Sequence, residues 1–147
     1  MVMPPLTVIG TETLCLLLTA RAPVQRVPAQ PWALSDALSH VARNVDKAGP
    51  LGQPTKIIRQ RSSDADEIVR RATRHLVAMG SLVPSGRGWH AGYEVPPQVR
   101  DSAIQLFQAL SPADQYALDT AVQRLVAMVT IWSKNPRADE PPRSVTV

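Results

Sequence analysis

The sequence predicts a mainly α-helical protein that carries one short β-hairpin. Hydrophobic residues make up 44% of the chain and aromatic residues only 4%, so the core consists of Leu, Val, Ile and Ala, which suits helices better than a β-sandwich. Five segments repeat apolar residues at helical spacing. One stretch, residues 82 to 95, joins two β-prone runs through a glycine pair. At 147 residues, the chain suits one domain, or a small domain with an added oligomerisation element.

The first predicted helix lies within residues 7 to 20, TVIGTETLCLLLTA, where Leu14, Leu17 and Leu18 fall on one stripe. Three prolines follow in the twelve residues RAPVQRVPAQPW. Proline lacks a backbone donor and has a fixed φ, so residues 21 to 32 are expected to form an extended connector.

The second predicted helix covers residues 33 to 44, ALSDALSHVARN, with its apolar side chains three or four positions apart. Residues 45 to 55 contain two glycines and two prolines and predict a loop. The following KIIRQR is compatible with a short strand or with the approach to the next helix.

The third predicted helix runs from about residue 64 to 79 and has two overlapping capping pairs, Ser63 with Asp66 and Asp64 with Glu67. Its acidic first turn suits the positive end of the helix dipole. The expected buried face consists of Ile68, Val69, Ala72, Leu76, Val77 and Met79. The opposite face is Glu67, Arg70, Arg71, Arg74 and His75.

The predicted hairpin over residues 82 to 95 places Arg87 at its tip, between two glycines that can adopt the positive φ of a tight turn. Pro84 indicates that the first strand lies at a sheet edge. Trp89 and Tyr93 share one strand face, so they are expected to pack beneath the hairpin rather than stack on bases.

Two helices are predicted after the hairpin, over residues 99 to 110 and 112 to 133. The second has a strong start, because a serine cap precedes Pro112 and a carboxylate stands at Asp114. Its apolar stripe is Leu118, Ala121, Val122, Leu125, Met128, Val129 and Trp132. Such a stripe requires a packing partner, which predicts a dimerisation region at 98–133. The proline-rich, charged segment 134–147 is expected to be disordered.

The net charge of +4 is concentrated in residues 56 to 87, where seven basic side chains stand against three acidic ones. The basic side chains are Lys56, Arg59, Arg61, Arg70, Arg71, Arg74 and Arg87. A basic window of this kind favours nucleic acid or another anionic surface as the partner.

Several classes of site have no support in the sequence. The lone Cys15 cannot form an internal disulfide and indicates a reducing, cytoplasmic setting. His40, His75 and His90 have no other ligand at metal-binding spacing, so no metal site is expected. No catalytic or cofactor-binding motif occurs, so neither an enzyme nor a cofactor is expected. We expect no membrane span, because the apolar runs are too short. We also expect no signal peptide, because the start MVMPPLTVIG lacks a basic leader and a cleavage site.

The segment IVRRATRHLVAMGSLVPSGRGWHAGYEV resembles the recognition helix and wing of the winged helix-turn-helix superfamily, and the order of three helices and a hairpin agrees with it. The closing LSPADQYALDTAVQRLVAMV resembles the dimerisation helix of MarR-type regulators. The wing tip Gly86-Arg87-Gly88 differs from the Asp-x-Arg pattern usual in that family. The resemblance implies a winged helix-turn-helix domain at 1–97 and C-terminal dimerisation helices.

The resemblance also implies a function: a homodimeric, cytoplasmic, bacterial transcription regulator that binds double-stranded DNA. A guanidinium can bond guanine O6 and N7 in the major groove. Side chains that flank the helix and at the wing tip suit phosphate contacts. The candidate DNA-binding residues are Arg59, Arg61, Ser62, Ser63, Arg70, Arg71, Arg74 and Arg87. A small-molecule effector is compatible with this function, but no residue can be assigned to it.

Two other interpretations of the same residues remain. Arg70, Arg71 and Arg74 are also compatible with a solvated helix face that pairs with Asp66 and Glu67. At the level of function, a winged helix can serve as a protein-interaction adaptor or as a plasmid or phage replication or partition protein.

Overall fold

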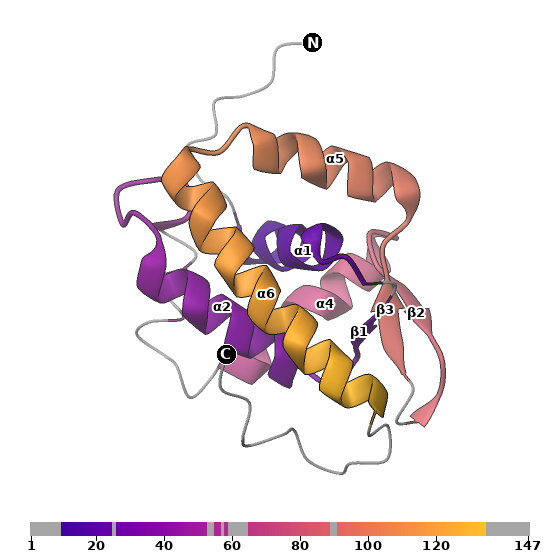
Figure 1. The fold of residues 1–147 in the computed structure, drawn as a ribbon. Helices are drawn as coiled ribbons and strands as arrows, with labels where there is room; N and C mark the ends of the chain where they lie inside the picture. Colours follow the sequence, from indigo (N-terminus) through magenta and orange to yellow (C-terminus); the bar gives the residue numbers. More distant parts are fainter. Residues whose placement is uncertain are drawn as a thin grey trace.

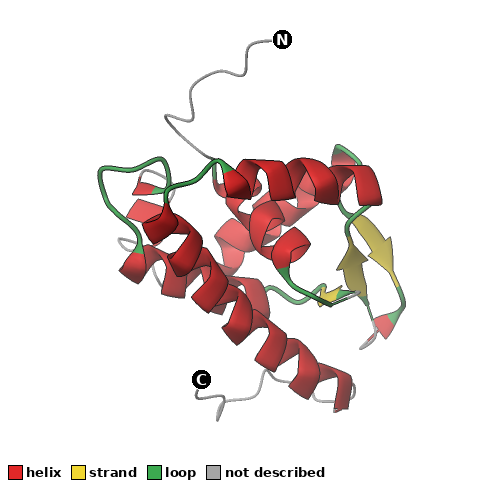
Figure 2. Cartoon of the chain, turned by 45° about the horizontal axis from the view of Figure 1, so that its top comes forward, coloured by secondary structure: helices red, strands yellow, loops and turns green. Residues whose placement is uncertain are grey.

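The computed structural model of the protein describes residues 10–24, 26–52, 55–56, 58, 65–88 and 91–134. Within these residues the chain is mainly helical, with a small antiparallel sheet at one end (Figures 1 and 2). The elements in order are α1 (Thr11–Arg21), β1 (Val27–Pro28), α2 (Trp32–Asn44), α4 (Ala65–Ala78), β2 (Val83–Ser85), β3 (Gly92–Glu94), α5 (Pro97–Gln108) and α6 (Pro112–Lys134). The five predicted helices are therefore confirmed, within a few residues at each end.

The connection between α2 and α4 differs from the loop expected over residues 45 to 55. Gly52 and Thr55 already have helical backbone, as do Lys56 and Ile58 after them. The Thr55 hydroxyl donates a hydrogen bond to the Leu51 carbonyl at 2.6 Å. A threonine within a helix commonly bonds in this way to the carbonyl four residues before it. The prediction of a loop is therefore wrong at Gly52 and Thr55, while Gln53 and Pro54 lie outside the described residues.

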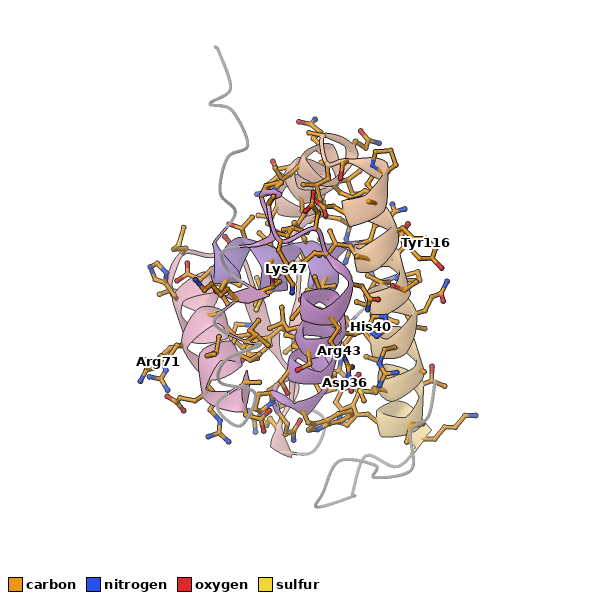
Figure 3. The ribbon with its side chains drawn as sticks, turned by 90° about the vertical axis from the view of Figure 1, so that its left-hand side faces the viewer. Asp36, His40, Arg43, Lys47, Arg71 and Tyr116 are labelled. Atoms are coloured by element: carbon orange, nitrogen blue, oxygen red, sulfur yellow. The ribbon has the colours of Figure 1, made fainter. Side chains whose placement is uncertain are left out.

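The helices form layers, with α1 and α2 between α4 on one side and α6 on the other (Figures 1 and 3). Helix α5 packs alongside α1 and connects the sheet to α6. The fully buried side chains between these layers are aliphatic, for example Leu14, Leu38 and Leu118. The low aromatic content therefore corresponds to a core of leucine, valine and alanine, as the composition predicts.

Helix α6 packs along α2 of the same chain, and this contact accounts for its apolar stripe. Leu125 is completely buried, and Leu118 is 1% exposed. Two hydrogen bonds from the Arg124 guanidinium to the Asp36 carboxylate, at 2.9 and 3.0 Å, join the two helices at the edge of this contact. The stripe thus has a packing partner within its own chain, so it does not by itself indicate a second subunit, and the dimerisation region at 98–133 stays a prediction. A homodimer itself stays a prediction.

The sheet has the strand order β1-β3-β2, with both pairs antiparallel. Strand β1 lies in the segment expected to be only an extended connector, and its Val27 pairs with Tyr93. Pro84 belongs to β2, which is an outer strand, so its predicted edge position is confirmed. The sheet ties the chain before α2 to the hairpin after α4, and so fixes the hairpin relative to the helices.

At Gly92 in β3, the neighbouring strand leaves no room for a side chain. A Cβ at this residue would lie 2.7 Å from the Val27 carbonyl oxygen. We expect Gly92→Ala to separate β1 from β3 and to lower the free energy of unfolding by about 1 kcal/mol. Urea denaturation measures this change, and Gly10→Ala is the control because nothing lies within 4 Å of its added Cβ. Equal stabilities of the two variants would contradict the strand contact.

The start of α6 is confirmed as a capped helix end. The Asp114 backbone amide donates to the Ser111 hydroxyl at 3.3 Å, and α6 begins at Pro112. Asp114 is only 1% exposed, and its Oδ1 has no hydrogen-bond partner among the described residues. Burial, the largest effect, raises the pKa of this carboxyl above its ordinary value, and the nearby Asp46 charge adds to that.

The raised pKa makes a prediction for stability against pH. The folded chain binds a proton at Asp114 more tightly than the unfolded chain, so this group destabilises the fold increasingly as pH rises from about 4 to the raised pKa. An asparagine side chain at the same position cannot ionise. We therefore expect the stability of Asp114→Asn, relative to the wild type, to improve as pH rises through that window. Urea denaturation from about pH 3.5 to about pH 7 tests this, and a constant difference between the two proteins would contradict it.

Candidate nucleic-acid interface

Helix α4 is held by its apolar face and by a polar contact at its first turn. Val69, Ala72 and Leu76 are buried against the rest of the chain. At the first turn, the Ser35 hydroxyl of α2 donates to the Asp66 carboxylate at 2.5 Å. Met79 was predicted to be buried but is 63% exposed, because α4 ends at Ala78 and the chain leaves the helical path.

The turn after α4 directs the chain into the hairpin. Gly80 has a φ of +77°, the left-handed conformation that ends a helix with least strain. The Ser81 amide donates to the Leu76 carbonyl at 2.9 Å, which closes the turn. Sequence and structure agree that Gly80 ends this helix.

The three arginines predicted as DNA contacts lie together on the outer face of α4. The Arg70 and Arg71 side chains are 59% and 77% exposed, and Arg74 is exposed as well. In Figure 3, Arg71 projects from α4 on the side of the molecule away from α6. The outer face of α4 is therefore open to a large partner.

The alternative interpretation, a face that pairs with its own acids, holds for part of this surface. The Glu67 carboxylate lies 3.3 Å from Arg71 Nε and 4.0 Å from Arg70 Nη1. No acidic group of the described residues forms an ion pair with Arg74. Exposed pairs of this kind contribute at most about 1 kcal/mol each, so a phosphate can displace them.

A groove of about 350 Å³ lies between α4 and the sheet, and it brings the helix arginines and the hairpin together. Arg70 and Arg74 line one side, while Ser85 and Gly86 line the other. Its remaining lining residues are Ala29, Thr73, Val77, Pro84, Ala91, Gly92 and Tyr93. The wall of the groove is mainly apolar, and the two arginines add positive charge along its α4 side.

The hairpin tip carries Arg87 next to this groove. Gly86 and Gly88 have the predicted positive φ values, 81° and 57°. The prediction of a tight turn is wrong, because Ser85 pairs with Gly92 and residues 86–91 form a longer connection between the strands. Arg87 is exposed and lies beside Gly86, which lines the groove, although Arg87 itself does not line it. The tip therefore adds a positive charge at the edge of the site.

Other predicted positions lie outside the described residues. They are Arg59, Arg61, Ser62 and Ser63, together with Trp89 and the expected disordered segment after Lys134. Tyr93 and Trp132 are half-buried against the core, as expected for packing residues, and so is Trp32.

Sequence reasoning missed the part of the groove wall formed by Ala29, directly after β1, and by Ala91, directly before β3. The Ala29 amide donates to the Ala91 carbonyl at 3.0 Å, and both residues line the groove. No local pattern at Ala29 predicts this, because its partner lies far along the chain in the hairpin. Ser85 had a local signal, since it stands one residue before the predicted glycine turn.

The structure describes neither a reactive cysteine nor a cluster of metal ligands on this face. Cys15 is fully buried in α1, where burial, with a smaller contribution from Glu12, raises its pKa to about 12. Its thiol is therefore protonated and unreactive at neutral pH. Among the described residues, no group of three or more His, Cys, Asp or Glu side chains could hold a metal ion.

A second groove, of about 400 Å³, lies between α1, α5 and Ser81. Its lining includes Leu17, Val99 and Leu106, and no charged side chain. None of these residues was singled out from the sequence as a binding residue, and nothing in the structure shows what would occupy the groove.

On the α4 face, Arg70 and Arg74 thus adjoin a groove that the hairpin also lines, with Arg71 and Arg87 nearby. In the described part of the chain, no helix has both the length and the apolar character needed to cross a bilayer. Neither a protein-family model, nor a curated protein, nor a solved structure matches this chain.

Proposed function

We propose that the protein is a winged helix-turn-helix regulator that binds duplex DNA in the cytoplasm, with α4 in the major groove and the β2–β3 hairpin as the wing. The observation that carries this proposal is the groove that Arg70 and Arg74 share with the hairpin. The order of helices before the hairpin and the positive charge of the 56–87 segment support it as well.

The dimensions of α4 are compatible with this role. The major groove of B-DNA is about 12 Å wide and admits one α-helix. Arg70 and Arg74 are one turn apart, about 6 Å along the helix axis, which corresponds to about two base-pair steps. Each guanidinium can donate two hydrogen bonds to guanine O6 and N7. Arg87 at the hairpin tip is suited to a phosphate or to a minor groove.

A homodimer is part of the proposal, because one small domain makes few phosphate contacts and two copies read a two-fold site. Since α2 covers the inner stripe of α6, the contact would use outer faces of α5 and α6. Tyr116, which is 73% exposed on α6 and labelled in Figure 3, lies on such a face. The LSPAD start of α6 supports a MarR-type arrangement. Sedimentation analysis across a concentration series is expected to give twice the chain mass.

The decisive experiment is selection from random duplexes, followed by sequencing of the retained DNA. We expect a two-fold symmetric motif and an affinity that falls steeply with salt, because bound phosphates release counterions. Retention of no duplex at any salt concentration would contradict the proposal. An acidic protein partner would then be the better explanation of the basic face.

A further inference from the structure

Two acids at the start of α4 have different surroundings. The Asp66 carboxylate accepts a hydrogen bond from Ser35 on α2, so it belongs to the contact between the two helices. The Glu67 carboxylate lies on the arginine face instead, within 4.0 Å of both Arg70 and Arg71. Its side chain is 51% exposed. Glu67 therefore meets any partner that the arginines meet.

A carboxylate at this position acts unequally on different DNA sequences. Binding to random duplex comes almost entirely from neutralised phosphates. Glu67 stands well within the screening length of about 8 Å from the two arginines, so it weakens each phosphate contact they make. In a duplex, its favourable base partner is the amino group of cytosine, from which a carboxylate can accept a hydrogen bond in the major groove.

The arginines also differ in their position relative to the groove. Arg74 lines the groove but has no ion pair with Glu67 or with any other acid of the described residues. Arg71 is paired with Glu67 and is not among the residues that line the groove. The closer ion pair of Glu67 is therefore with Arg71 on the flank of the helix, at 3.3 Å, and the longer one is with Arg70 beside the groove, at 4.0 Å. Arg74 has no such pair with a described acid and keeps its full charge for a base edge.

We propose that Glu67 is a specificity-determining residue, which reduces binding to DNA in general more than it reduces binding to the preferred site. This inference rests on the proposed function. The structural basis is the placement of a single half-exposed carboxylate between two guanidiniums on the face that would enter the groove. Removal of its charge should strengthen random binding and should not strengthen selected binding to the same extent.

The test is Glu67→Gln, which removes the charge and keeps the shape and helix propensity. Dissociation constants are measured for the duplex selected by the wild type and for a random duplex, over a salt series. We expect affinity for random duplex to rise about tenfold, with a steeper salt dependence, and affinity for the selected duplex to rise less than about threefold. The ratio between the two affinities should therefore fall.

The matched control is Asp101→Asn on α5, which changes the net charge by the same amount at an exposed position on another helix. It should leave the ratio of affinities unchanged. An equal gain by Glu67→Gln on both duplexes, or the same fall in ratio for Asp101→Asn, would overturn the inference while the proposed function stands. A wild-type protein that binds no duplex would instead refute the proposed function, and this inference with it.

Discussion

Arg74→Ala is expected to weaken binding to the selected duplex by about 1 to 3 kcal/mol and to relax the preference at the base pair that Arg74 reads. The reason is its position, because Arg74 lines the groove between α4 and the hairpin and no described acid pairs with it. The double variant Arg70→Ala, Arg74→Ala should lose more binding free energy than either single variant. Fluorescence anisotropy with the selected duplex and its single-base variants measures both effects.

The comparison variant is Arg71→Ala, on the same helix but outside the groove. A side chain on the flank reaches phosphates, so its loss should weaken selected and random duplexes alike and flatten the salt dependence. If Arg74→Ala also weakened both duplexes equally, Arg74 would not read a base.

The helices were predictable from sequence because their signals are local. The start of α6 was predicted from three neighbouring residues: a serine cap, Pro112 at position N1 and the Asp114 carboxylate at N3. In the structure, α6 begins at Pro112. Gly80 placed the end of α4 in the same way. The exposed face of α4 also followed from the helical period of about 3.6 residues, which put Arg70, Arg71 and Arg74 on one side.

The groove beside that face was not predictable, because it depends on contacts between distant segments. Val27 pairs with Tyr93, far along the chain, and the prolines near Val27 argued locally against a strand. Proline is compatible with β1 because this strand lies at a sheet edge, where a donor is not needed on the outer side. The predicted burial of Met79 was wrong for a similar reason, because helical periodicity does not show at which residue the chain leaves the helix.

The apolar stripe of α6 shows a further limit of periodicity. A stripe indicates that a helix is covered, but it does not say whether the same chain or a second chain covers it. Here α2 does so, with Leu38 and Val41 fully buried on its side. Mutation separates the two cases, because loss of a core side chain destabilises the fold, whereas loss of an interface side chain changes association.

Leu125→Ala is therefore expected to lower the free energy of unfolding by about 2 to 5 kcal/mol. Leu125 is completely buried in the middle of α6, so the shorter side chain leaves a cavity between α6 and the rest of the core. Urea denaturation monitored by circular dichroism measures the change, with an unchanged dependence on denaturant as the sign that the same surface unfolds.

The control is Gln123→Ala, an exposed position on α6, which should change stability by less than about 0.5 kcal/mol. A small loss for Leu125→Ala, accompanied by a shift from dimer to monomer in sedimentation, would place this stripe in an interface and contradict the packing of α6 on α2. A large loss at every protein concentration would assign Leu125 to the core of a single chain. Any dimer would then depend on the outer face of α6, where Tyr116 lies.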